Sequence, residues 1–205
     1  MSARRLTFHL IPHTHWDREW YLPRAAFQSR LAGAATALAK LLDDDPAARF
    51  TLDGQTILLD DALAMRPELA ETLTRAVHEQ RLDIGPWYVL TDEQIPAGES
   101  LLRNLLLGSQ DARQVGSRMD VLYSPDAFGH PAALPMLAHE FGMGTGVIWR
   151  GLGGSGDTGD LYRWHAPSGD EIVIYHLPPQ GYEVGGDLPD AGQQQIGRAS
   201  CRERV

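Results

Sequence analysis

The chain has 205 residues, 43% of them hydrophobic and 22% charged, which is enough to bury a core as one domain or as part of a larger one. Its net charge of −9 argues against a nucleic-acid partner, because binding to a phosphate backbone needs clustered lysine and arginine. The single cysteine, Cys201, excludes an internal disulfide framework and a cysteine-rich zinc module, so any metal must be held by His, Asp and Glu.

The two ends of the chain carry little structural information. The apolar run over residues 6–12 is interrupted by His9 and is too short for a signal peptide or a membrane span, so we expect a cytoplasmic protein without a membrane partner. The last ten residues, IGRASCRERV, resemble the in-frame translation of a common sequencing-library adapter. We therefore expect residues 1–195 to be native and residues 196–205 to be a non-native tail.

Strands and helices are predicted in alternation from the hydrophobic periodicity. A compact apolar run predicts a buried strand over 6–11, and the spacing of apolar residues predicts a helix over 27–42. The elements that follow are predicted as a strand over 49–52, a helix from about 56, a helix over 67–80, an extended segment over 82–89, a helix over 100–115, a strand over 121–124, a helix over 132–141 and a strand over 146–149. This order indicates an α/β fold with parallel strands and crossover helices.

The pattern changes after Arg150. GLGGSGDTGD, residues 151–160, is a glycine-rich loop. The segment LYRWHAPSGDEIVIYHL, residues 161–177, places two apolar runs around a Pro-Ser-Gly-Asp turn, which predicts a β-hairpin appended to the α/β core.

Four clusters of unusual residues each fall at or just past the end of a predicted strand. They are HTHWDREW (13–20), GPWYVLTDE (85–93), SPDAFGH (124–130) and WR (149–150). Because the carboxyl ends of parallel strands meet at one rim of the sheet, these clusters indicate one shared pocket.

The first cluster contains metal-ligand residues at strand spacing. In an extended segment His13, His15 and Asp17 project to the same side, and two imidazoles with a carboxylate suit a catalytic metal site with open positions. A hydrogen-bonded structural role for the histidines is the alternative. Trp16 and Trp20 are either core residues or an aromatic surface for the apolar face of a sugar ring.

The third cluster presents a carboxylate at a turn. Pro125 ends the strand before Asp126, so the side chain is expected at the rim, either capping the next helix or serving as a metal ligand or nucleophile. Arg150 is either the charged partner that orients Asp126 or part of a surface salt bridge.

In this order, HTHWDREW, GPWYVLTDEQIPAGESLLRNLLLG, SPDAFGH, VIWRG and LPPQGY resemble the amino-terminal catalytic domain of glycoside hydrolase family 38, the α-mannosidases, over residues 6 to about 190. The likeness is greatest to the bacterial branch that includes mannosylglycerate hydrolase. It implies a barrel of the (β/α)7 type, incomplete at its carboxyl end in this chain, and a mannose-containing glycan or mannosyl glycoside as the substrate.

The resemblance also implies roles for individual residues. It makes His15, Asp17 and Asp126 ligands of one zinc ion and Asp126 the nucleophile of a retaining glycosidase, which forms a covalent glycosyl-aspartate. It places Trp20 against the reacting sugar, Phe128 in the pocket wall and Arg150 beside Asp126, with His13 as a supporting partner of the metal site.

The chain departs from the family pattern because the acid/base residue and a fourth zinc ligand are expected beyond its end. Asp92 and Glu93 are candidates for the acid/base residue within the chain, but we expect them to have structural roles instead. The sequence is therefore interpreted as a fragment whose own activity is doubtful, with a homo-oligomeric full-length form left open. A metal-dependent carbohydrate deacetylase and a non-catalytic sugar- or metal-binding module are the alternatives.

Overall fold

The computed structural model describes residues 9–152, 160–179 and 181–183. It divides into two compact units. The first is formed by Met1–Val89 and Leu106–Met119, and the second by Leu90–Leu105 and Asp120–Val205. The tail over 196–205, most of the glycine-rich loop and the start of the first predicted strand lie outside the described residues.

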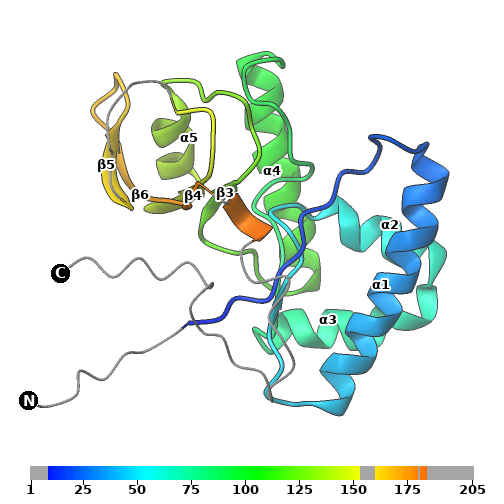
Figure 1. The fold of residues 1–205 in the computed structure, drawn as a ribbon. Coiled ribbons are helices and arrows are strands. Elements are labelled where there is room, and N and C mark those ends of the chain that lie inside the picture. The colour runs from blue at the N-terminus through cyan, green and yellow to red at the C-terminus, as the bar shows by residue number, and fades with distance from the viewer. Residues whose placement is uncertain (1–8, 153–159, 180, 184–205) are drawn as a thin grey trace, which may run out of the picture. The chain divides into compact units, whose positions relative to one another are not determined.

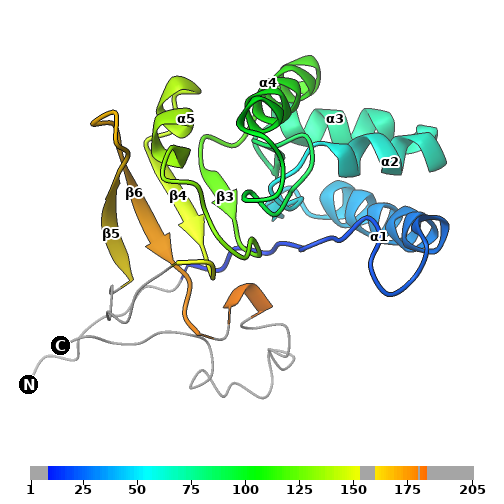
Figure 2. The ribbon, with the colours of Figure 1, turned by 90° about the horizontal axis from the view of Figure 1, so that it is seen from above.

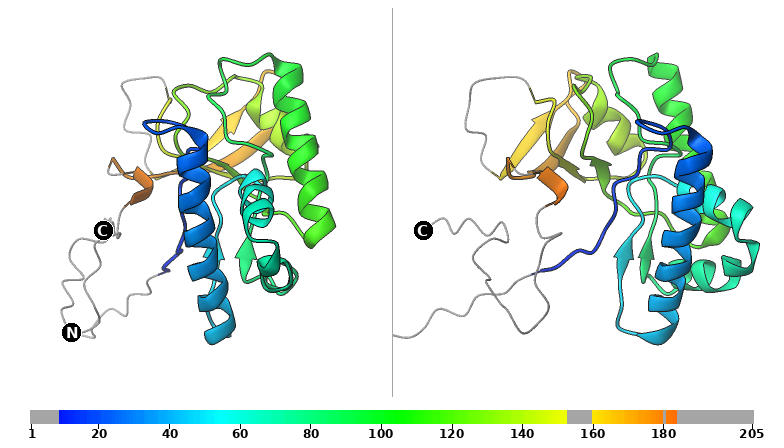
Figure 3. Two further views of the ribbon diagram at one scale, coloured as in Figure 1. Left: turned by 90° about the vertical axis from the view of Figure 1, so that its right-hand side faces the viewer. Right: turned by 45° about the vertical axis from the view of Figure 1, so that its right-hand side comes forward.

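Helices form the core of the first unit, and the helices predicted over 27–42, from about 56 and over 67–80 are confirmed. They are α1 (Arg24–Asp44), α2 (Ile57–Met65), the 3-10 turn η1 (Pro67–Leu69) and α3 (Ala70–His78). In α1 the buried side chains recur every three or four residues, as at Phe27, Leu31, Ala35, Leu38 and Leu42. In Figures 1 and 3, α1 (blue) runs beside α2 and α3 (cyan), and their apolar faces share one core.

A short parallel ladder lies against these helices. It joins β1 (Phe50–Thr51) to β2 (Leu82–Asp83), with Phe50 opposite Leu82. His13 forms a further parallel bridge to Thr51, through hydrogen bonds from Thr51 N to Pro12 O (2.9 Å) and from Thr14 N to Thr51 O (3.3 Å).

The prediction of a buried strand over 6–11 is wrong for its described part. Residues 9–11 have no regular structure, and Leu10 and Ile11 are 72% and 70% exposed. The chain pairs further along, at residues 12–14, where Pro12 offers only its carbonyl to the ladder because proline has no N–H. The pairing therefore ends directly before the side chains of His15 and Asp17.

The segment predicted as extended over 82–89 is also interrupted. Only Leu82–Asp83 belongs to the ladder, and Trp87 returns to it as an isolated bridge to Gln55. Between them the chain turns at Gly85, whose φ of 71° favours glycine, and at Pro86, which cannot donate a ladder hydrogen bond.

The helix α4 (Gly98–Val115) confirms the prediction over 100–115, and its residues from Leu106 onward belong to the first unit. Gly108 lies against the main chain of the neighbouring 86–88 segment. A Cβ atom at this position would be 2.3 Å from Trp87 C and 2.4 Å from Tyr88 N. The absence of a side chain at Gly108 therefore allows the helix to approach this backbone.

The second unit contains a four-stranded sheet in the order β3-β4-β6-β5. Its strands are β3 (Leu122–Ser124), β4 (Thr145–Ile148), β5 (Leu161–His165) and β6 (Glu171–His176). Strands β3, β4 and β6 are parallel, whereas β5 is antiparallel to β6 at the sheet edge. The hairpin prediction is confirmed, and β6 also extends the parallel sheet.

Alternation along the strands gives this sheet a buried face. In β6, Ile172 and Ile174 are buried while Val173 and Tyr175 are exposed. The helix α5 (Leu134–Glu140) contributes the buried side chains Leu134, Leu137 and Ala138, and it lies on one side of the strands (Figure 2). A second 3-10 turn, η2 (Gly181–Glu183), ends the described chain.

The structure thus has the α/β class and predominantly parallel strands that the sequence predicts. Across the described ranges the strands form one two-stranded and one four-stranded sheet, and no closed barrel. In the same part of the chain, no helix combines the length and the apolar composition that crossing a bilayer requires.

We expect Gly108→Ala to lower the free energy of unfolding by about 2 kcal/mol, because overpacking against backbone costs up to about 3 kcal/mol and alanine returns about 1 kcal/mol of helix propensity. The matched control is Gly33→Ala in α1, where an added Cβ has no neighbour within 4 Å. That control is expected to be neutral or stabilising in urea unfolding, and equal effects of the two substitutions would contradict the close approach.

Candidate active site

The segment that follows His13 is held by Asp53, a residue that the sequence analysis did not single out. Asp53 is fully buried (0% exposed) and follows β1 with a φ of 51°. Its Oδ2 accepts hydrogen bonds from Trp16 N and Gln55 Nε2, both at 2.9 Å, and its Oδ1 accepts one from Gly54 N at 3.0 Å. Hydrogen-bond donors on both oxygens offset the cost of burying this carboxylate.

Asp53 also faces the ring of His15. The His15 Nδ1 atom lies 3.3 Å from Asp53 Oδ2, and His15 Nε2 lies 3.9 Å from Asp17 Oδ1. The side chain of His15 is largely buried, whereas that of Asp17 is 43% exposed. An imidazole with one nitrogen toward a buried carboxylate and the other toward a second carboxylate has the chemistry of a metal ligand with its orienting partner.

These residues provide two donors for a metal ion. In the ranges that the structure describes, no three His, Cys, Asp or Glu side chains lie close enough together to hold one. His15 and Asp17 belong to the first unit and Asp126 to the second. His15 and Asp17 lie near each other, and the metal-ligand roles of His15, Asp17 and Asp126 all stay predictions.

Arg18 ties the same segment to α2. Its Nε and Nη2 atoms donate hydrogen bonds to both oxygens of the buried Asp61, at 2.7 and 3.0 Å, and Arg24 Nη2 adds one at 3.3 Å. Burial raises the pKa of Asp61, but the hydrogen bonds and charges of Arg18 and Arg24 outweigh it and lower the pKa below its usual range. The polar first motif is thus anchored by two buried carboxylates.

The two tryptophans of this motif have different environments. Trp16 packs against the core of the first unit, with its ring edge-on to Phe27 at 6.3 Å between centroids. Trp20 is 73% exposed and touches Tyr21 edge-on at 5.2 Å. Trp16 is therefore a partly buried residue packed against the core, and Trp20 presents an aromatic surface to solvent. The role predicted for the side chain of His13 stays a prediction.

In the second unit, Asp126, Phe128 and Arg150 lie together. Arg150 Nη2 forms an ion pair with Asp126 Oδ1, and the Arg150 guanidinium lies 4.0 Å from the centroid of Phe128 and 5.0 Å from that of Trp149. Phe128 is 67% exposed. The carboxylate is thus presented beside an exposed ring at the end of β3, with its charge partner in place.

The loop that carries these residues is anchored by Asp92 and Glu93. Asp92 Oδ1 accepts a hydrogen bond from Phe128 N at 3.2 Å. Glu93 Oε2 lies 2.8 Å from His130 Nδ1, and Glu93 Oε1 accepts a hydrogen bond from the Ser124 hydroxyl. His130 had no assigned role at the sequence level, although it belongs to the SPDAFGH cluster.

His130 also reaches the neighbouring loop. Its Nε2 lies 2.9 Å from the carbonyl oxygen of Arg150, and the side chains of His130 and Glu93 are almost completely buried. Burial lowers the pKa of His130. The hydrogen bond and charge of Glu93, together with the hydrogen bond to the Arg150 carbonyl, outweigh this effect, so the pKa of His130 is raised above its ordinary value.

The loops after β3 and β4 touch through their main chains. Gly151 has a φ of 82°, and a Cβ atom there would lie 2.6 Å from Gly129 N and 2.7 Å from Ala127 O. Only glycine therefore fits directly after Arg150.

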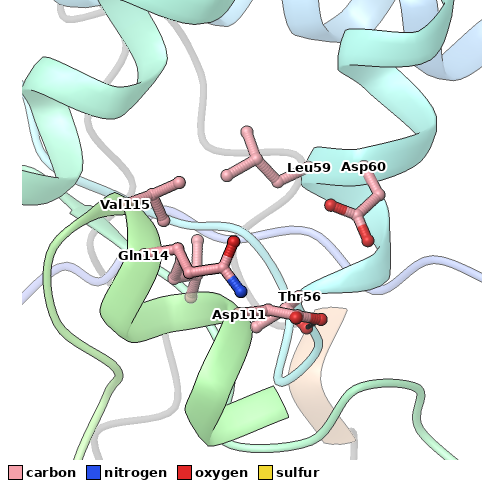
Figure 4. Close-up of a pocket in the computed structure, with 7 residues that line it drawn as sticks. Thr56, Leu59, Asp60, Asp111, Gln114 and Val115 are labelled. Atoms are coloured by element: carbon pink, nitrogen blue, oxygen red, sulfur yellow. Dashed lines mark hydrogen bonds between the residues drawn. The ribbon is translucent and has the colours of Figure 1, made fainter. Parts of the chain in front are cut away.

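A small pocket in the first unit contains none of the predicted site residues (Figure 4). Asp60 of α2 and Asp111 of α4 face it, together with Thr56, Leu59, Ile84, Gln114 and Val115. Burial and the charge of Asp111 raise the pKa of Asp60, and burial raises that of Asp111. The arrangement places like charges near each other without the histidines of the predicted site.

We expect Arg18→Met to lower the free energy of unfolding by about 2–3 kcal/mol at pH 7, because it leaves Asp61 buried with Arg24 as its remaining charged partner. The pKa of Asp61 is lowered by folding, so this contribution is present above its ordinary pKa and is lost as the pH falls through the folded-state pKa. Urea unfolding at pH 7 and near pH 3 measures both effects.

The control is Arg75→Met, which removes an exposed ion pair with Asp43 in the same unit. It is expected to cost less than about 1 kcal/mol. A loss for Arg18→Met no greater than that of the control, or one that persists unchanged at pH 3, would contradict the anchoring role of Arg18.

The comparisons with known proteins agree with the sequence-level resemblance. A protein of Halalkalibacterium halodurans named "Putative mannosylglycerate hydrolase" is 35% identical over 196 residues, which cover 89% of this chain and 22% of that protein. The crystal structure of an α-mannosidase from Enterococcus faecalis V583 matches with a TM-score of 0.82 and 33% identity, over 87% of this chain and 21% of the other.

A second Enterococcus faecalis structure, described as a protein in glycosyl hydrolase family 38, matches with a TM-score of 0.74 and 28% identity, over 91% of this chain and 20% of the other. The chain thus spans about a fifth of the length of these relatives. Residues 5–201 match the model of the N-terminal domain of the family 38 glycosyl hydrolases. The chain therefore belongs to glycosyl hydrolase family 38, the family of the α-mannosidases that the sequence motifs resemble.

Proposed function

We propose that this chain is the amino-terminal part of the catalytic domain of a zinc-dependent retaining α-mannosidase. The observation that carries the proposal is the carboxylate of Asp126, paired with Arg150 and set beside the exposed ring of Phe128 in a chain of this family. We propose an oligosaccharide or a mannosylglycerate-like glycoside as the substrate, in keeping with the name of the Halalkalibacterium relative.

In the proposed reaction, an oxygen of Asp126 attacks the anomeric carbon of the mannosyl residue. The new bond replaces the glycosidic carbon–oxygen bond, and the leaving group takes a proton from an acid residue. Water then hydrolyses the glycosyl-aspartate with net retention of configuration. Arg150 supports this role because its guanidinium pairs with the Asp126 carboxylate and limits rotation of its side chain.

The acid of this reaction is assigned to none of the described carboxylates. Glu93 is buried, and its two oxygens contact Ser124 and His130. Asp92 accepts a hydrogen bond from the Phe128 backbone N–H. These contacts favour structural roles for both residues. We propose that the acid and a fourth metal ligand belong to a longer protein, whose further strands also complete the barrel, and that residues 196–205 are not native.

His15, Asp17 and Asp126 are the proposed zinc ligands. When bound, zinc supplies the positive charge that holds adjacent hydroxyls of the sugar and favours distortion of its ring. Asp53 supports the metal site by directing His15 Nε2 toward Asp17, since His15 Nδ1 faces the buried carboxylate. The exposed rings of Trp20 and Phe128 suit contact with the apolar face of a sugar.

Asp126→Asn in the complete enzyme is expected to lower kcat at least about a thousandfold, because the amide is a poor nucleophile. In the unsubstituted enzyme, a fluorinated mannosyl probe should label Asp126 covalently, and mass spectrometry of the peptides detects this label. Asp170→Asn, at the turn before β6 in the same unit and paired with the exposed His139, is the control with unchanged turnover. Turnover without a covalent adduct would instead favour the deacetylase alternative, and unchanged turnover of Asp126→Asn would exclude its role as nucleophile.

Asp53→Asn is expected to weaken zinc binding by the complete enzyme about 10- to 100-fold, because the amide no longer fixes the His15 ring through a charged hydrogen bond. Competition with a chelating dye measures the affinity, and thermal unfolding of the zinc-free protein checks the fold. Asp44→Asn, which removes an exposed pair with Lys40, serves as the control. Equal zinc affinities of the two variants would contradict the orienting role of Asp53.

A further inference from the structure

His130 connects three segments of the second unit. Its Nδ1 lies 2.8 Å from Glu93 Oε2, and its Nε2 lies 2.9 Å from the carbonyl oxygen of Arg150. Glu93 in turn accepts a hydrogen bond from the hydroxyl of Ser124, the last residue of β3. One buried ring therefore links the segment before α4 to the loops that follow β3 and β4.

The partners of His130 determine which atoms carry protons. A carbonyl oxygen only accepts hydrogen bonds, so the Nε2 atom must donate to Arg150 O. The Nδ1 atom faces the carboxyl group of Glu93. An ionised carboxyl group accepts a hydrogen bond from a charged imidazolium, and a protonated one donates a hydrogen bond to a neutral imidazole. In both cases the hydrogen bond to Arg150 comes from Nε2, and Glu93 fixes the plane of the ring.

The carbonyl held by His130 belongs to the residue whose side chain pairs with Asp126. The Arg150 guanidinium contacts Asp126 and the rings of Phe128 and Trp149. Its buried Nε atom makes no hydrogen bond with any residue that the structure describes. The side chain is thus incompletely held by its own contacts, which makes the position of its main chain important.

We propose that His130 is a positioning residue for the proposed glycosidase reaction: by holding the Arg150 carbonyl, it keeps the Arg150 guanidinium on the Asp126 carboxylate. The inference rests on the proposed function. It gives a role to His130, whose hydrogen-bond partners are Glu93 and the Arg150 carbonyl. Small displacements of a reacting group lower the rate strongly while leaving remote substrate contacts intact. The effect of losing His130 should therefore appear in kcat more than in KM.

Two substitutions of similar size separate the contacts of the ring. His130→Gln places an amide N–H near the former Nε2 and can keep the bond to Arg150 O, whereas His130→Asn places its amide near the former Nδ1 and keeps only the Glu93 side. Steady-state kinetics of the complete enzyme on an aryl α-mannoside measure kcat and KM, and thermal unfolding measures stability. His139→Gln, an exposed histidine paired with Asp170 in the same unit, is the control.

We expect kcat to fall about 100-fold in His130→Asn and less than about tenfold in His130→Gln, with KM changed less than about threefold in both. The control should match the unsubstituted enzyme. Equal kcat values for the two variants, or losses of kcat that follow only the loss of thermal stability, would overturn the proposal.

Glu93→Gln keeps the proposal testable if the His130→Asn variant does not fold. The amide introduced by this substitution would accept a hydrogen bond from the Ser124 hydroxyl and donate one to His130 Nδ1. His130 Nε2 would then still donate its hydrogen bond to the Arg150 carbonyl. The kcat of this variant should stay within about threefold of that of the unsubstituted enzyme; a loss above about 100-fold in a folded variant would overturn the proposal and point to Glu93 itself as an acid. An unsubstituted enzyme without mannosidase activity would instead refute the proposed function.

Discussion

Buried carboxylates with complete sets of hydrogen-bond donors are the constraint on which the rest of the structure depends. Burying a carboxylate without partners costs several kcal/mol, so each one fixes the groups that surround it. Asp53 and Asp61 hold the first motif in this way, and Glu93 holds the loop that carries Asp126. The polar residues of the motifs are thus positioned by carboxylates on other segments, and the short strands only bring these segments together.

The same principle separates residues that support from residues that are presented outward. Asp53, Glu93 and His130 are buried and bonded on several sides. Trp20 and Phe128 are exposed, and Asp17 is half-buried, in the segments that follow the strands. In the proposed function, the exposed residues contact the sugar and the buried ones keep them in place.

Much of the fold is predictable from the sequence because helices and hairpins depend on local patterns. The periodicity predicts α1 and α4 within a few residues, and the turn at 166–170 predicts the pairing of β5 with β6. The strand over 6–11 was mispredicted because an apolar run was equated with burial. The parallel pairing of β6 with β4 was missed because partners distant in the chain leave no local signal. Asp53 and His130 were overlooked for the same reason: their importance comes from contacts with distant residues.

The central claim is that a divalent ion unites the two groups of predicted ligands. A crystal structure of the complete enzyme, with zinc located by anomalous scattering, tests it most directly. The account predicts that His15 Nε2 and carboxylate oxygens of Asp17 and Asp126 all lie about 2.0–2.2 Å from the ion. An ion bound elsewhere, or an Asp126 carboxylate outside its coordination sphere, would contradict the account.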